Sequence, residues 1–143
     1  MTACVLDASV AVKWFLPPHR EELVEEAFAL LRKHEQGQLQ FFVPDLFWAE
    51  SGNIFWKAVR LRRCSRETAE RSIGVLKAGR LITVPSLDLL REAFTIATDF
   101  GRSYYDSLYV ALAAVSQIPF VTADEKLSNA LAGQFPVRWL GST

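Results

Sequence analysis

The stretch MTACVLDASV, residues 1–10, decides the fold, because an uncharged and largely apolar run ends on a single acid, Asp7. The continuous apolar run at residues 3–6 predicts a strand buried on both faces. A short helix is predicted to begin directly after it, near Ala8. Similar runs predict further strands at residues 39–43, 81–84 and 120–122, with a candidate fifth strand at 137–140.

Helical periodicity separates these runs. Residues 21–34 place four aliphatic side chains on one stripe, and Gly37 is available to end that helix. Because strands alternate with helices, we expect one α/β domain over residues 1–143, a three-layer α/β/α sandwich around a parallel sheet of four or five strands. In such sheets ligands bind beyond the carboxyl ends of the strands. The other helices are predicted at residues 46–63, 66–78, 87–100, 107–116 and 125–131.

The composition limits the partners and the cellular compartment that we expect for the protein. Sixteen basic and sixteen acidic residues give a net charge of zero, so any contact with nucleic acid must be local. Cys4 and Cys64 are too few for a disulfide framework, which favours a reducing cytoplasm. No secretory signal or membrane-spanning segment is predicted. We therefore expect a soluble cytoplasmic protein.

Two acids lie just after predicted strands. Asp7 follows the first strand, and Asp124 follows the fourth within VTADEKL, so both lie at the carboxyl edge of the sheet. The alternative for Asp7 is a helix N-cap. For Asp124, Thr122 and Glu125 form a T-x-x-E capping box, which predicts that Asp124 has no capping role.

Two further acids lie on predicted helices. Glu50 falls on an apolar face, where a carboxylate needs either a cation or a basic partner such as Lys57 or Arg60. Asp106 begins a run that is apolar around nearly its whole circumference, and its alternative role is again an N-cap. The apolar neighbours of Glu50 on its helix are Leu46, Phe47, Ile54 and Leu61.

Together the four acids predict a metal site. Carboxylates within about 5 Å of one another repel by roughly 3 kcal/mol per pair, so a cation or protons must neutralise them. An all-oxygen set suits Mg²⁺ or Mn²⁺, which would support phosphodiester hydrolysis, and Ser9 could orient a metal-bound water or help to cap. His19 and His34 are predicted to be solvated surface residues. No phosphate-binding Gly-rich loop or nucleophile elbow is present in the sequence.

At these positions the sequence resembles the PIN-domain family, in particular the VapC toxins of toxin–antitoxin pairs. The resemblance rests on VLDASV, PDLFWAES, YYDSLYVALA and VTADEKL, which occur in the order and spacing of the family and cover nearly the whole chain. It implies a small three-layer ribonuclease, usually a homodimer, that is silenced by a cognate antitoxin. The family's metal and catalytic acids map onto Asp7, Glu50, Asp106 and Asp124, with Ser9 near the metal.

Two surface features fit this resemblance. Trp48, Phe55 and Val59 form a second apolar stripe on the Glu50 helix, which predicts a surface for a partner. A dense basic stretch is either a solvated face or a site for RNA phosphates. It comprises Lys57, Arg60, Arg62, Arg63 and Arg66.

The leading hypothesis is therefore a metal-dependent endoribonuclease of the VapC type, with RNA as substrate following chiefly from the resemblance. One alternative is a receiver-like signalling module whose acids bind Mg²⁺ so that an Asp accepts phosphate. The other is a noncatalytic scaffold that binds RNA or protein. The single acid in VLDAS argues against the receiver, and the intact acids argue against the scaffold.

Overall fold

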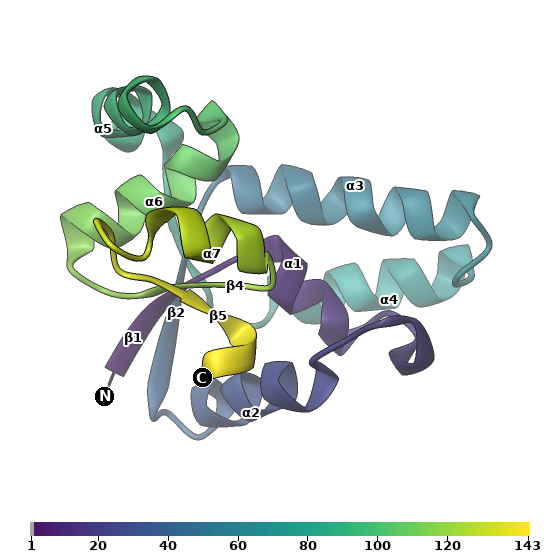
Figure 1. Cartoon of the computed structure of the whole chain (residues 1–143). Helices are drawn as coiled ribbons and strands as arrows, with labels where there is room; N and C mark the ends of the chain where they lie inside the picture. The colour runs from purple at the N-terminus through teal and green to yellow at the C-terminus, as the bar shows by residue number, and fades with distance from the viewer. Residues whose placement is uncertain (1) are drawn as a thin grey trace.

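Five parallel strands form one sheet in the order β3-β2-β1-β4-β5 (Figure 1). The computed structural model describes residues 2–143. A receiver-like fold has the order 2-1-3-4-5, so the receiver alternative is wrong. The strands are β1 Thr2–Leu6, β2 Leu39–Pro44, β3 Ile82–Val84, β4 Phe120–Thr122 and β5 Val137–Trp139.

β1 lies at the centre of the sheet. Val5 pairs with Phe42 of β2 on one side and with Phe120 of β4 on the other. Val5 and Leu6 are completely buried, because helices cover both faces of the sheet. This double burial explains why the central strands are continuous apolar runs rather than alternating ones.

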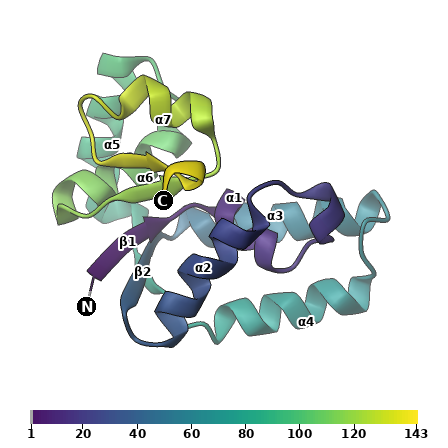
Figure 2. The same ribbon diagram turned by 60° about the horizontal axis from the view of Figure 1, so that its bottom comes forward.

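The helices form the two outer layers (Figures 1 and 2). α6 packs against β1, β2 and β4, and α5 lies against α6, while α2 contacts β2. The predicted three-layer α/β/α architecture with a five-stranded parallel sheet is confirmed. The helices are α1 Ala8–Ala11, α2 Val24–Glu35, α3 Leu46–Arg60, α4 Arg66–Lys77, α5 Ser86–Phe100, α6 Tyr104–Ser116 and α7 Glu125–Leu131.

α3 and α4 are joined by a tight turn and form an arm that extends to the right of the sheet in Figure 1. α3 ends at Arg60, three residues before the predicted end, because Arg62 adopts a left-handed conformation with φ of 58°. Ser65 then caps α4 by accepting a hydrogen bond from the Thr68 N–H at 3.0 Å. Among residues 2–143, every helix falls short of the length and apolar character that crossing a membrane requires.

The second apolar stripe on α3 belongs to the core, so the prediction that it faces a partner is wrong. Phe55 is 2% exposed, and Trp48 and Val59 pack against the core cluster. The α3–α4 arm explains the difference, because α4 packs along α3 and gives it a second surface to cover. The strongly exposed apolar residues of α3 and its end are instead Trp56 and Leu61.

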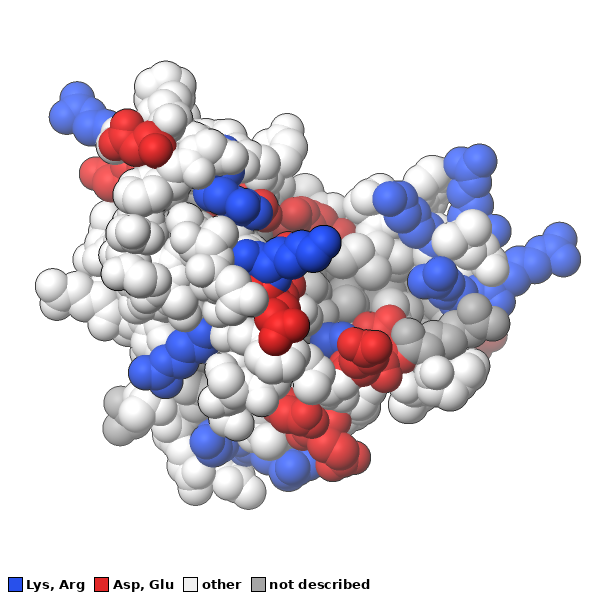
Figure 3. Space-filling view, in the orientation of Figure 1, with Lys and Arg blue, Asp and Glu red and all other residues white. Residues whose placement is uncertain are grey.

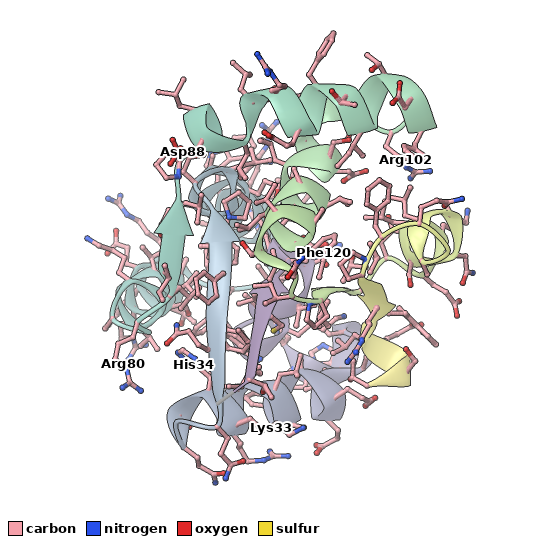
Figure 4. All side chains as sticks on the ribbon, turned by 90° about the vertical axis from the view of Figure 1, so that its left-hand side faces the viewer. Lys33, His34, Arg80, Asp88, Arg102 and Phe120 are labelled. Atoms are coloured by element: carbon pink, nitrogen blue, oxygen red, sulfur yellow. The ribbon has the colours of Figure 1, made fainter. Side chains whose placement is uncertain are left out.

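His34 is also buried, contrary to the expectation of a surface residue, whereas His19 is exposed as predicted. The His34 ring stacks on Phe41 with centroids 4.5 Å apart. Its nitrogens lie 3.1 Å from the carbonyl oxygen of Leu39 and 2.6 Å from that of Gly79. The ring is labelled beside β2 in Figure 4, where it helps to wall a cavity of about 400 Å³ between α2 and α4.

Candidate active site

Asp7 lies at the carboxyl end of β1, where it is the N-cap of α1. Its Oδ1 accepts a hydrogen bond from the Ser9 N–H at 3.3 Å, and its Oδ2 accepts one from the Thr122 hydroxyl at 2.7 Å. Burial raises the pKa of Asp7 to about 6, and the negative charge of Glu50 adds to the rise. Asp7 is therefore both a cap and a carboxylate held in an environment that disfavours its charge.

Glu50 extends from α3 toward α6. Its Oε1 accepts a hydrogen bond of 2.6 Å from the hydroxyl of Tyr109. Burial raises the pKa of Glu50 and the nearby charge of Asp106 contributes, although the Tyr109 hydrogen bond acts in the opposite direction. Within the described chain, the hydrogen-bonding partner of Glu50 is thus a neutral phenol and not Lys57 or Arg60.

Asp106 is the third residue of α6 and is partly exposed. Ser103 caps this helix by accepting a hydrogen bond from the Asp106 N–H at 3.0 Å. The N-cap alternative for Asp106 is therefore wrong, because the helix begins at Tyr104, before the apolar run that predicted it. The Asp106 carboxylate has no capping role, and its negative charge contributes to the raised pKa of Glu50.

Asp124 is exposed at the end of β4 and caps α7, accepting a hydrogen bond from the Leu127 N–H at 3.1 Å. The predicted capping box between Thr122 and Glu125 is wrong, because α7 begins at Glu125 and leaves Asp124 as its N-cap. The Thr122 hydroxyl is instead fully buried and bound to Asp7. The same oxygen accepts a hydrogen bond from the Asp124 N–H at 3.0 Å.

Ser9 also connects the ends of β1 and β4. Its hydroxyl oxygen accepts a hydrogen bond from the Ala123 N–H at 3.3 Å. The backbone of the Asp124 segment is thereby held against the Asp7 segment from two sides, by Ser9 and by Thr122. Ser9 is partly buried in this position.

The structure thus links the acids in two groups. The charge of Glu50 adds to the raised pKa of Asp7, the charge of Asp106 adds to the raised pKa of Glu50, and Asp124 is tied to Asp7 through Thr122. Over residues 2–143, no three acidic, histidine or cysteine side chains already stand close enough to hold a metal ion. All the donors are hard oxygens, and a divalent cation would offset the cost of their buried charge. The donor set therefore suits Mg²⁺ or Mn²⁺ if the carboxylates rotate toward a common point.

Two polar residues of the site were not recognised from the sequence as carboxylate partners. Thr122 is predicted to be part of a cap, and no role at the site is predicted for Tyr109. A signal for Tyr109 exists, because it follows Asp106 by three residues and therefore shares its helix face. The role of Thr122 depends on the register between β4 and β1, which no local pattern carries.

Charge is distributed unevenly around this site. Figure 3 shows a recess between the body of the molecule and the α3–α4 arm, with both acidic and basic side chains beside it and a group of basic ones over the far end of the arm. The five basic residues of that end are all exposed, with Arg60 lying over the Trp56 ring at 5.3 Å and Arg66 paired with Glu70 at 2.8 Å. They are Lys57, Arg60, Arg62, Arg63 and Arg66.

Comparison with known proteins identifies the family to which the chain belongs. The family model described as PIN domain matches residues 4–131. Two curated relatives come from Pyrobaculum aerophilum. Exonuclease VapC9 is 33% identical over 92 residues, which are 64% of this chain and 67% of that protein. Ribonuclease VapC3 is 29% identical over 127 residues, which are 87% of this chain and 92% of that protein.

Solved structures share the fold. One is described as a toxin–antitoxin complex from Klebsiella pneumoniae, and its matching chain superposes with a TM-score of 0.61 at 12% identity. The match covers 94% of this chain and 95% of that one. At this level of identity the likeness concerns the path of the backbone.

Proposed function

Since the chain belongs to the PIN-domain family and is a VapC-type ribonuclease, we propose that it hydrolyses RNA internally with Mg²⁺ or Mn²⁺ held by four acids. The observation that carries the proposal is the linked set of carboxylates at the carboxyl edge of the sheet, where the charge of Glu50 adds to the raised pKa of buried Asp7 and the charge of Asp106 adds to the raised pKa of Glu50. The four acids are Asp7, Glu50, Asp106 and Asp124.

The acids have different parts in this proposal. The pKa of Asp7 is about 6, so its carboxylate is mostly charged at neutral pH and can bind a cation. Glu50 and Asp106 face each other across α3 and α6, and Asp124 closes the group from the end of β4. A divalent ion bound among them supplies charge that activates water and offsets the negative charge of the scissile phosphate.

The substrate would lie along the recess beside the α3–α4 arm. Arg60 is roughly 15 Å from Glu50 along α3, at about 1.5 Å per residue, so the basic end of the arm would contact the RNA backbone away from the cut. Phosphate contacts of this kind hold and orient the nucleic acid without reading its sequence. They also explain how a chain with zero net charge can bind RNA.

The test is cleavage of a labelled RNA by the purified protein with Mg²⁺, with Mn²⁺ or with a chelator. We expect internal cuts that require the divalent ion and are lost in Asp7→Asn, which keeps the side-chain shape. Asp88→Asn, an exposed acid in the first turn of α5, is the matched control and should cut normally. Cutting in the presence of chelator, or full activity of Asp7→Asn, would contradict the proposal. RNA or protein binding without any divalent-metal binding in calorimetry would favour the noncatalytic scaffold.

We further propose that the chain is the toxin of a VapBC-type pair with a cognate antitoxin. The Klebsiella pneumoniae neighbour is described as a toxin–antitoxin complex, which supports such a partner here. Expression of the chain alone should arrest growth, and co-expression of the protein encoded beside it should relieve the arrest. Such a role places the protein in the cytoplasm, consistent with its two free thiols. Absence of arrest would point to a housekeeping nuclease.

A homodimer is proposed on separate grounds. Leu87, Leu90 and Phe94 recur along one side of α5 and are 80%, 53% and 62% exposed. An apolar stripe of this kind on the surface of a single chain marks an interaction site. Light scattering should give twice the chain mass for the wild type, and Leu90→Asp should give a monomer. A monomeric wild type would contradict the proposal.

A further inference from the structure

Tyr109 joins two layers of the acidic site. It is 2% exposed within α6, and its ring stacks on Phe120 of β4 with centroids 5.2 Å apart and planes inclined by 16°. Figure 4 shows Phe120 beneath α6, and β4 lies next to the central strand β1. This stacking fixes the plane of the phenol, so its hydroxyl can reach only a small region. In that region it donates to Oε1 of Glu50 at 2.6 Å.

The surroundings of the hydroxyl keep it a donor. Burial, followed by the negative charges of Asp7 and Glu50, raises the pKa of Tyr109 far above its ordinary value. The phenol is the hydrogen-bond donor in this contact, and the carboxylate oxygen is the acceptor. The hydroxyl donates one hydrogen bond, and its acceptor is a carboxylate 59 residues away in sequence.

Glu50 is subject to two opposing influences from α6. Asp106 and Tyr109 are three residues apart and share one face of the helix. The charge of Asp106 disfavours the Glu50 carboxylate, whereas the Tyr109 hydroxyl stabilises it. Glu50 has a flexible side chain on a different helix, and the Tyr109 hydrogen bond joins its Oε1 to α6.

We propose that Tyr109 is a positioning residue that holds Glu50 in the orientation required to bind the divalent ion. The hydrogen bond occupies one lone pair of Oε1, so that Oε2 and the second lone pair of Oε1 are left for the cation. This inference rests on the proposed metal-dependent function. It adds a residue that touches neither the ion nor the RNA but sets the geometry of one that does.

The test compares Tyr109→Phe with Tyr105→Phe. Tyr109→Phe keeps the ring and its stacking on Phe120 and removes only the hydroxyl, while Tyr105→Phe removes a hydroxyl from a 62% exposed residue of the same helix. Mn²⁺ affinity is measured by calorimetry, without RNA. We expect Tyr109→Phe to bind Mn²⁺ about tenfold or more weakly, in line with the usual loss when a residue that orients a metal ligand is removed. Tyr105→Phe should bind like the wild type.

Kinetics separate positioning from a purely structural role. For Tyr109→Phe we expect an unchanged KM for RNA and a lower kcat at limiting Mn²⁺, with recovery of kcat as Mn²⁺ is raised. Thermal unfolding without metal supplies a further readout, because the shifts of Tyr109→Phe and Glu50→Gln should fail to add in the double variant. Additive shifts would mean that the two side chains act independently.

The outcomes distinguish the two proposals. If the wild type neither binds Mn²⁺ nor cuts RNA, the proposed function fails. If the wild type does both and Tyr109→Phe matches it in Mn²⁺ affinity, the function stands and the role of Tyr109 is overturned. Equal losses in Tyr109→Phe and Tyr105→Phe would also overturn it.

Discussion

Thr122 donates its hydroxyl to Oδ2 of Asp7 across 2.7 Å, joining the carboxyl ends of β4 and β1 through side chains as well as through the sheet. The same oxygen accepts the Asp124 N–H at 3.0 Å. Because Thr122 is fully buried, water cannot take the place of its hydroxyl without rearrangement. One hydroxyl thus sets the spacing of two of the four acids.

Thr122→Val should therefore destabilise the protein, although it preserves the shape of the side chain. An oxygen of Asp7 and the Asp124 N–H would both lose a partner, at a cost of about 1 to 3 kcal/mol in the free energy of unfolding. Urea denaturation measures this cost. Thr122→Ser keeps the hydroxyl and should lose less, so a Val variant as stable as the wild type would show that the bond to Asp7 contributes little.

The free energy of unfolding should depend on pH because Asp7 titrates differently in the folded and unfolded states. Burial raises its pKa to about 6 from 3.8, so the folded protein holds the proton more tightly than the unfolded chain. The stabilising contribution is present below the unfolded pKa and is lost as the pH rises through about 6. Without divalent ions, Asp7→Asn should be more stable than the wild type near neutral pH, by on the order of 3 kcal/mol. Urea denaturation from about pH 4 to about pH 8 should show this difference vanish at the acid end.

His34 should matter for stability far more than His19. Replacing His34 by Ala removes the ring stacked on Phe41 and the hydrogen bond that its ring N–H donates to one of the two neighbouring backbone carbonyls. We expect the free energy of unfolding to fall by about 1 to 3 kcal/mol. His19→Ala changes an exposed residue and should stay within about 0.5 kcal/mol of the wild type. Equal effects of the two substitutions in thermal unfolding would contradict the buried position of His34.

Two ion pairs offer a further comparison. Lys13 is buried, and its ammonium lies 3.4 Å from Oε1 of Glu21, whose side chain is 18% exposed. Glu21→Gln would leave this ammonium without its counter-charge, and we expect a loss of about 3 kcal/mol in the free energy of unfolding. Glu70→Gln breaks the exposed pair with Arg66 and should have no measurable effect. Denaturation of both variants in parallel tests whether burial determines how much each ion pair contributes to the free energy of unfolding.

The sheet could be predicted from the sequence because its central strands are buried on both faces and therefore form continuous apolar runs. The predicted strand at residues 3–6 corresponds to β1, Thr2–Leu6, and the fourth strand matches β4 residue for residue. The end of α3 could not be predicted in the same way. Arg62 and Arg63 are good helix formers, and only the left-handed turn at Arg62 shows that the helix has ended.

The site was predictable in part. The strand-end positions of Asp7 and Asp124 follow from the apolar runs before them, and the need of Glu50 for a partner follows from its apolar helix face. The identity of the partners could not be predicted, because Tyr109 and Thr122 reach their carboxylates only through tertiary packing and strand register. The burial of His34 was missed for the same reason, since its two carbonyl partners lie outside its own helix.

The bond between Thr122 and Asp7 spans 115 residues of chain, and β1 has β4 as one of its two neighbours. During synthesis, Asp7 leaves the ribosome early and its sheet neighbour follows only when most of the chain has been made. A ribosome that stops before β4 releases a fragment with an open sheet and without Asp124. The order of synthesis thus delays assembly of the four acids until β4 has joined β1.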